Sequence, residues 1–216
     1  MEIANKNILI IIAHPDDETI GCGGFINKAS LQNANCKVLL PVRRGDLRGI
    51  TNWEKLINQL NDACNILGAE LVVTDEMVSD ITADVNVHQL YKIIESHVQW
   101  ADIVLTHWHG DSHQAHRAVA RAVELATRPF RVQKTVIFFE IATSTDQAFQ
   151  YTFSPNFFVA LNADQVSKKV KAMAMYETET ESGRTPMNLE NQMRLRGSQS
   201  GQEYAEAYMI ARHYLI

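Results

Sequence analysis

Two short segments gather the residues that could carry out a hydrolysis. The first is the run His14-Pro15-Asp16-Asp17-Glu18, and the second is residues 107–116, which hold four of the eight histidines. A zinc hydrolase needs about three His or carboxylate ligands, an open position for water, a base for the proton of that water and a donor for the oxyanion. The two segments contain side chains for all of these roles. A mixed His and carboxylate set favours zinc over calcium or magnesium, although Fe(II) or Co(II) would accept the same ligands.

Apolar runs that alternate with segments of helical periodicity predict the elements that position these residues. The predicted strands span residues 8–13, 37–42, 70–74, 102–106, 135–141 and 157–161, and the predicted helices span residues 18–30, 53–67, 87–98, 113–126, 164–176 and 203–212. This order predicts an α/β fold with a Rossmann-like, mostly parallel sheet and helices on both faces. Ligand sites in such sheets form beyond the carboxyl ends of the strands. We therefore expect the two polar segments, each of which follows a strand, to meet at one edge of the sheet.

Length and composition are typical of one globular domain over residues 1–216. The chain is 46% hydrophobic and 21% charged, and no linker or internal repeat divides it. A net charge of −5 argues against a nucleic-acid partner and against a polybasic membrane anchor. The apolar run at residues 8–13 is too short to span a bilayer, and no cleavage site follows it. We predict no integral membrane segment, a cytoplasmic location and three reduced thiols at Cys22, Cys36 and Cys64.

The chain resembles the PIG-L/LmbE family of zinc-dependent N-deacetylases in three places. The run from Ala13 to Glu18, followed by Gly21-Cys22-Gly23-Gly24, is similar to the opening motif of that family. The pattern Asp111-x-His113-x-x-His116 is similar to its second motif, and residues 196–197 and 205–208 resemble its C-terminal block. The resemblance implies one zinc ion per chain and removal of an N-acetyl group from an amino sugar or an N-acetylglucosamine conjugate. Because members of the family often assemble, it also allows a homo-oligomer.

The resemblance assigns a role to each matching residue. It implies that His14, Asp17 and His116 bind the metal and that Asp16 is the general base. It implies that His113 stabilises the oxyanion or protonates the departing amine. His113 and His116 are three residues apart, so they share one face of the predicted helix.

Position 115 departs from the pattern of the family. An aspartate usually stands there and orients the catalytic histidine, whereas this chain has Ala115. We expect either that Asp111 replaces it as the catalytic carboxylate or that His113 acts as a neutral donor. The family often also has an Arg in the helix before its Leu-Gly pair, and the nearest positions here are Leu56 and Gln59.

Substrate contacts are therefore expected from other residues. Arg44 and Arg48 follow the second predicted strand and would lie on the side of the sheet that carries the site. Trp108 lies in the second segment and could stack on a sugar ring. We interpret Cys22 as a small packing residue, and His107 as a residue that borders the site without binding the metal.

The sequence argues against one other function and leaves a second one open. A nucleotide-cofactor enzyme should have a Gly-x-Gly-x-x-Gly turn after the first strand, but residues 14–18 occupy that position. A degenerate relative that binds zinc or a sugar without turnover would explain Ala115 and the missing Arg. Metal analysis together with a test for acetate release separates this alternative from the enzyme.

Overall fold

The innermost strand shows why the chain forms a sheet that is covered on both faces. In β1 (Asn7–Ile11), residues Ile8 to Ile11 are fully buried. Successive side chains of a strand point to opposite faces. Ile8 and Ile10 accordingly pack in one hydrophobic cluster, and Leu9 and Ile11 pack in the other. A strand without a polar face has to lie between two layers of helices.

The computed structural model describes residues 1–179 and 183–214, except the side chains of residues 48–50. Its sheet has seven strands in the order β3-β2-β1-β4-β5-β7-β6. Besides β1, the strands are β2 (Asn35–Arg43), β3 (Glu70–Ser79), β4 (Ile103–His107), β5 (Thr135–Phe139), β6 (Phe157–Leu161) and β7 (Tyr204–Arg212). The first five strands of the chain are parallel, and β7 is antiparallel to both β5 and β6.

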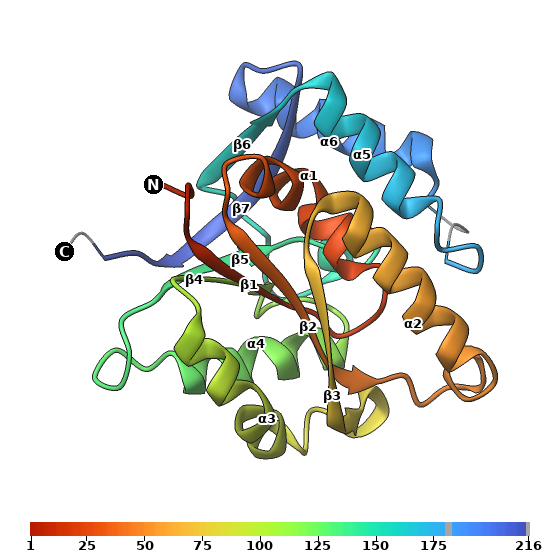
Figure 1. Cartoon of the computed structure of the whole chain (residues 1–216), viewed down its shortest axis with the longest axis vertical. Helices are drawn as coiled ribbons and strands as arrows, with labels where there is room; N and C mark the ends of the chain where they lie inside the picture. The colour runs from red at the N-terminus through yellow and green to blue at the C-terminus, as the bar shows by residue number, and fades with distance from the viewer. Residues whose placement is uncertain (180–182, 215–216) are drawn as a thin grey trace.

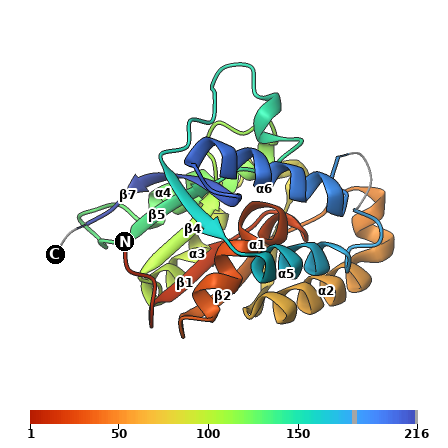
Figure 2. The same cartoon turned by 90° about the horizontal axis from the view of Figure 1, so that it is seen from above.

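Six α-helices form the outer layers (Figures 1 and 2). They are α1 (Asp17–Ser30), α2 (Leu47–Leu67), α3 (Val87–Trp100), α4 (Gln114–Ala126), α5 (Ala163–Met173) and α6 (Pro186–Ser200), with short 3₁₀ turns η1 (Asp80–Thr82) and η2 (Thr145–Gln147). In Figure 1, α3 and α4 cover one face, and α1, α2, α5 and α6 lie on the other. The predicted α/β class with helices on both faces is confirmed, with a single domain. No helix among the described residues is both long and apolar enough to cross a membrane.

The prediction was wrong at the C-terminal end of the chain. Residues 204–212 form the strand β7 instead of a helix, and the helix α6 precedes it. In β7, Tyr204 and Tyr208 pack in one hydrophobic cluster and alternate with small alanines, which is a period of two. The start of α6 carried its own signals: the side chain of Thr185 caps the helix by accepting from the Asn188 N–H, and Pro186 follows it.

A buried carboxylate of β7 anchors the helix that carries the first polar segment. Helix α1 has non-helical backbone angles at Cys22, so its second half begins with unsatisfied N–H groups. Glu206 accepts from the N–H groups of Gly24 at 2.8 Å and Phe25 at 2.6 Å. It also accepts from Lys169 Nζ at 2.6 Å, so its charge is paired inside the core. The C-terminal strand thus fixes α1 against the sheet.

Candidate functional site

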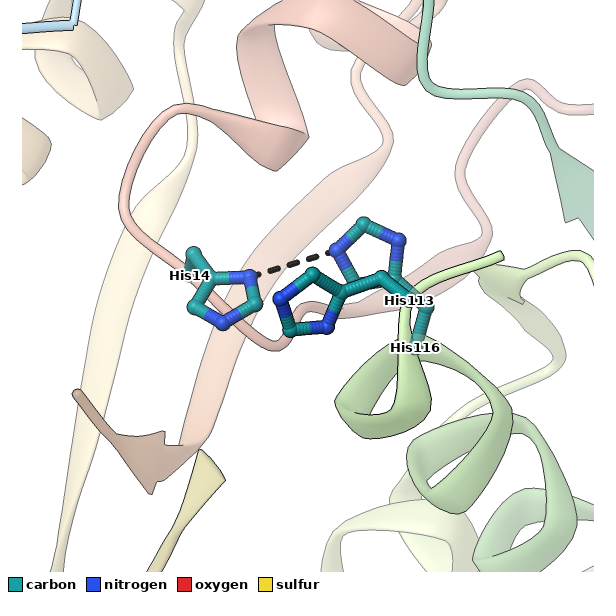
Figure 3. A group of neighbouring side chains, drawn as sticks. All are labelled: His14, His113 and His116. Atoms are coloured by element: carbon teal, nitrogen blue, oxygen red, sulfur yellow. Dashed lines mark hydrogen bonds between the residues drawn. The ribbon is translucent and has the colours of Figure 1, made fainter. Parts of the chain in front are cut away.

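The carboxyl ends of β1 and β4 bring the two polar segments together. These strands are adjacent and parallel, with Ile11 opposite Thr106. The loop after β1 carries His14 and leads into α1, and the loop after β4 leads into α4, which carries His116 in its first turn. Figure 3 shows that the imidazoles of His14, His113 and His116 converge between the loop and the start of α4. The predicted meeting of the two segments is thereby observed.

One nitrogen each of His14 and His116 and one oxygen of Asp17 lie close to the spacing of ligand atoms around one metal ion. His14 Nδ1 lies 3.2 Å from His116 Nε2, and Asp17 Oδ2 lies 3.5 Å from the first nitrogen and 3.6 Å from the second. Tetrahedral zinc with bonds of 2.0–2.1 Å separates its ligand atoms by about 3.4 Å. His116 and Asp17 are almost fully buried, at 2% and 1% exposed, and His14 is partly exposed toward the pocket. Two overlapping groups of donor atoms in this region each lie within 4.8 Å of one another and could hold an ion: one is His14, His113 and His116, and the other is Asp17, His107 and His116.

A carboxylate lies behind each of the two imidazoles. Asp80 Oδ2 lies 3.5 Å from His14 Nε2, and the N–H of Gly45 donates to the other oxygen of Asp80 at 2.7 Å. Asp111 Oδ1 lies 3.1 Å from His116 Nδ1. Metal-binding histidines commonly donate their second N–H to a carboxylate, which fixes the tautomer and the direction of the ring. Both imidazoles therefore have the surroundings of metal ligands.

The pKa values within the cluster follow from burial and from these partners. Burial lowers the pKa of His14, but hydrogen bonds to Asp17 and Asp80 outweigh it and raise the pKa to about 9. Burial, together with the nearby His107, lowers the pKa of His116 to about 3. The pKa of Asp17 is held well below its usual range because His116 and His107 outweigh the effect of burial. The cluster therefore contains a carboxylate that stays ionised, as metal binding requires.

Asp16, the predicted general base, is held in a sparsely populated backbone conformation. Its φ is 108°, and its side chain is 1% exposed. Oδ2 accepts from Arg184 Nη1 at 2.8 Å, whereas Oδ1 is buried and has no hydrogen-bond partner among the described residues. Burial raises the pKa of Asp16 well above its usual range, against the lowering effect of Arg184. A buried acceptor without a partner is costly, so this oxygen is suited to hold a proton donor such as water.

Several further contacts fix Asp16 in this position. The N–H of Asp16 donates to Glu18 Oε2 at 3.2 Å, and Tyr176 donates to the other oxygen of Glu18 at 2.7 Å. Arg184 Nε donates to Thr143 Oγ1 at 3.2 Å. Thr143 itself has a φ of 75°, and a Cβ on Gly183, whose φ is 94°, would lie 2.8 Å from its methyl group. Unusual backbone conformations thus converge on Asp16, which is typical of functional sites.

His113 lies at the pocket surface with one ring nitrogen already engaged. It is the N-cap of α4, and its Nδ1 accepts from the Ala115 N–H at 3.2 Å. The proton of the neutral ring is therefore on Nε2, which is a donor. Burial and the nearby His14 lower the pKa of His113 to about 4, and the helix N-terminus also disfavours a charged imidazole. This environment favours a neutral His113, which can donate a hydrogen bond to an oxyanion, over a charged His113 that would protonate the departing amine.

Asp111 requires a correction. We expected its carboxylate to replace the missing aspartate beside the His113 ring. Instead, it faces His116 and accepts from Ser144 Oγ and, at 2.6 Å, from Thr145 Oγ1, while only the backbone N–H of His113 reaches it, at 2.8 Å. Burial raises the pKa of Asp111, but the His116 imidazole, and after it the Ser144 and Thr145 hydroxyls, outweigh burial and lower the pKa. The Asp111 carboxylate therefore faces the ring of His116 and not the ring of His113.

His107 lies closer to the cluster than the sequence suggested. It is fully buried and stacks on His116 with 3.9 Å between ring centroids. Its Nε2 lies 3.3 Å from Asp17 Oδ2 and accepts from the Ala13 N–H at 3.0 Å. The donor atoms of His107, Asp17 and His116 also lie within 4.8 Å of one another, and Asp17 Oδ2 likewise accepts a backbone N–H, that of His14 at 2.7 Å. We interpret His107 as a support for Asp17 and His116. Cys22 is buried, and burial raises the pKa of its thiol well above the usual range, which agrees with a packing role.

A pocket of about 780 Å³ opens over the cluster. Its wall contains Arg44, as predicted, but it does not contain Trp108. The indole of Trp108 is 2% exposed and packs edge-on against Phe153, so its predicted stacking on a sugar is wrong. The side chain of Arg48 lies outside the described residues. The lining consists of His14, Asp16, Arg44, Asp46, Asp80, Ile81, Ser112, His113, Gln114, His116, Thr143, Gln147, Thr178, Glu179 and Arg184.

Three charged residues of the wall were missed in the sequence. Asp80 begins the 3₁₀ turn η1 after β3, and Glu179 and Arg184 lie in the connection between α5 and α6. None of them belongs to a local motif. The place of Asp80 at the carboxyl end of a parallel strand was the one available signal.

A family model describes the N-terminal part of this architecture. The model PIG-L, described as GlcNAc-PI de-N-acetylase, matches residues 9–127, which is more than half of the chain. The chain belongs to the PIG-L family. The match covers both polar segments, from β1 to the end of α4. This PIG-L member is thus an enzyme of a deacetylase family, as the resemblance implied.

Solved structures share the fold along nearly the whole chain. The N,N′-diacetylchitobiose deacetylase from Pyrococcus horikoshii has a TM-score of 0.72 at 19% identity, with 95% of this chain and 83% of that chain covered. The pseudoaglycone deacetylase Dbv21 has a TM-score of 0.78 at 17% identity, with 98% and 100% covered. The 4-carboxy-2-hydroxymuconate hydratase from Pseudomonas putida KT2440 has a TM-score of 0.70 at 19% identity, with 98% of each chain covered. At these identities the likeness shows the fold alone. No match was found among curated proteins.

Proposed function

We propose that this PIG-L family member is a zinc-dependent amidohydrolase that removes an N-acetyl group from an amino sugar. The observation that carries the proposal is the triangle of His14 Nδ1, His116 Nε2 and Asp17 Oδ2, with sides of 3.2, 3.5 and 3.6 Å. A site with three protein ligands and an open position is typical of catalytic zinc. The family supports the reaction class, and the polar wall of the pocket supports a sugar.

Bound zinc would supply positive charge that makes water more acidic and polarises a carbonyl group. Asp16 would take the proton of the attacking water through Oδ1, because Arg184 already occupies Oδ2. A carboxylate whose pKa is raised by burial is a better proton acceptor near neutral pH than an ordinary one. Because the backbone of Asp16 and its Oδ2 atom are held in place, the direction of Oδ1 is also fixed.

His113 would stabilise the oxyanion that forms from the amide carbonyl. Its Nε2 carries the proton of the neutral ring because Nδ1 accepts from the Ala115 N–H. A donor that is already in place costs no reorganisation when charge develops. Cleavage of the C–N bond then needs a proton for the departing nitrogen, and Asp16 holds the proton that it took from water. One proton of the water reaches the nitrogen through Asp16, and the second leaves the new carboxyl group and protonates the amine, so the products are acetate and an ammonium group, and atoms and charges balance.

The function is tested by removing the metal and measuring acetate. Purified protein is expected to contain one zinc per chain and to release acetate from N-acetylglucosamine or its glycosides. Chelation should abolish the release, and one equivalent of zinc should restore it, because an open-site zinc enzyme loses its electrophile without metal. Zinc at full occupancy without acetate from any N-acetyl amino sugar would contradict an enzyme and favour a protein that only binds.

A further inference from the structure

We propose that this pocket selects amino sugars that carry no phosphate or carboxylate group, because the two arginines among its described lining residues, Arg44 and Arg184, are already paired with carboxylates of the chain. The inference rests on the proposed function and names the charge of its substrate. Family membership alone leaves this charge open, since the model that matches is named for a phosphoinositide-linked sugar.

Arg44 is held between two carboxylates. Its Nε lies 3.0 Å from Asp46 Oδ1, and its Nη1 donates to Glu179 Oε1 at 3.2 Å. The Arg44 side chain is only 12% exposed, so water screens these pairs less than it screens a surface pair. A substrate phosphate would have to displace one of the two carboxylates or add a third anion beside them.

Arg184 is paired with the proposed base. Its Nη1 lies 2.8 Å from Asp16 Oδ2, and its Nε is engaged with Thr143. Release of Arg184 to a substrate anion would also release Asp16 from its fixed position. Among the described residues that line the pocket, Arg44 and Arg184 are the only lysine or arginine side chains.

Carboxylates outnumber the guanidinium groups in this wall. Asp16, Asp46, Asp80 and Glu179 all line the pocket. The two positive charges of a bound zinc ion would be offset by Asp17, a proposed ligand, and by Asp111, which faces the other nitrogen of His116. The described residues of the wall therefore carry more negative than positive charge when the metal is present, and an anionic substituent is repelled.

The uncharged members of the wall suit hydroxyl groups. Amides and hydroxyls donate and accept hydrogen bonds with similar ease, and the carboxylates accept from sugar O–H groups. Ile81 is the one aliphatic side chain among the described residues of the lining. A polyhydroxylated neutral ring matches this surface better than an anion does. The uncharged polar residues of the lining are Ser112, Gln114, Thr143, Gln147 and Thr178.

The inference is tested with three N-acetylated sugars on the zinc-loaded protein. They are the methyl glycoside of N-acetylglucosamine, N-acetylglucosamine 1-phosphate and N-acetylmuramic acid. We expect kcat/KM for the two anions to be about 10–100-fold lower than for the neutral glycoside at low salt, as like charges at close range require. Raising the ionic strength should narrow the difference, because screening weakens repulsion and leaves a steric barrier unchanged.

A charge-removing variant separates repulsion from poor fit. Glu179→Gln frees Arg44 from one carboxylate, so the ratio of anionic to neutral kcat/KM should rise by about 10-fold. The matched control is Glu2→Gln, which makes the same change in net charge. Glu2 is exposed and precedes β1, at the end of this strand that lies away from the pocket. The control should leave the ratio at the wild-type value.

The outcomes distinguish this inference from the proposed function. Equal or better turnover of the phosphate, or a ratio that Glu179→Gln leaves unchanged, overturns the inference while acetate release still supports the function. If no sugar is hydrolysed, the proposed function is wrong. The ratio of anionic to neutral binding constants, measured at equilibrium for the three sugars, then tests the inference. Tighter binding of the anions would then overturn the inference as well, and weaker binding would support it.

Discussion

Asp16→Asn is expected to lower kcat by a factor of about 10²–10⁴, which is the contribution of a general base. The variant keeps the size and shape of the side chain but removes its ability to take a proton. Asn tolerates positive φ better than most residues, so the backbone at 108° should be retained. Zinc content should be unchanged, because the proposed ligands are His14, Asp17 and His116. The measurement is steady-state acetate release, with zinc determined on the same sample.

Asp62→Asn is the control for this variant. Asp62 is exposed on α2 and lies outside the pocket wall, and the substitution makes the same chemical change. It should leave kcat at the wild-type value. If Asp16→Asn keeps wild-type kcat, another group takes the proton and Asp16 has no part in the mechanism.

The second large effect is expected for His116→Ala. Partners in the outer shell of a metal already change its affinity by about 10–100-fold, so loss of a direct ligand should weaken zinc binding by more than about 100-fold. Turnover at low zinc should then fall to background. Equilibrium dialysis against a competing chelator measures the affinity.

The control separates metal loss from misfolding. His116 is buried and stacks on His107, so its removal also leaves a cavity and lowers stability by about 1–3 kcal/mol. A urea melt of the zinc-free protein should therefore show a cooperative transition at a lower midpoint. His88→Ala, at an exposed histidine on α3, should change neither measurement. Wild-type zinc affinity in a folded His116→Ala variant would remove His116 from the ligand set.

The sequence was most informative where residues that could do chemistry directly follow a predicted strand. The apolar run of β1 predicted a strand buried on both faces, and the polar segments directly after two strands predicted a shared edge. Parallel sheets bring these ends together, so proximity of His14 and His116 followed from topology without knowledge of any loop. Their distance of 3.2 Å then required the coordinates.

The remaining parts of the site depend on contacts between segments far apart in the sequence. Arg184 reaches Asp16 across 168 positions, and nothing near either residue indicates this pair. Trp108 lies in the polar segment next to His107 and His109, but its indole packs in the protein interior. A bulky indole gains more free energy from burial than from exposure in a loop. Residues 204–212 contain helix-favouring alanines, yet pairing between β5 and β6 decided their conformation.

The central claim is that His14, Asp17 and His116 bind one zinc ion, and crystals of the zinc-loaded protein test it most directly. An anomalous difference map recorded at the zinc edge should show one peak per chain, about 2.0–2.1 Å from His14 Nδ1, His116 Nε2 and one oxygen of Asp17. A peak that lies elsewhere, or no peak at these three side chains in fully loaded crystals, would contradict the account.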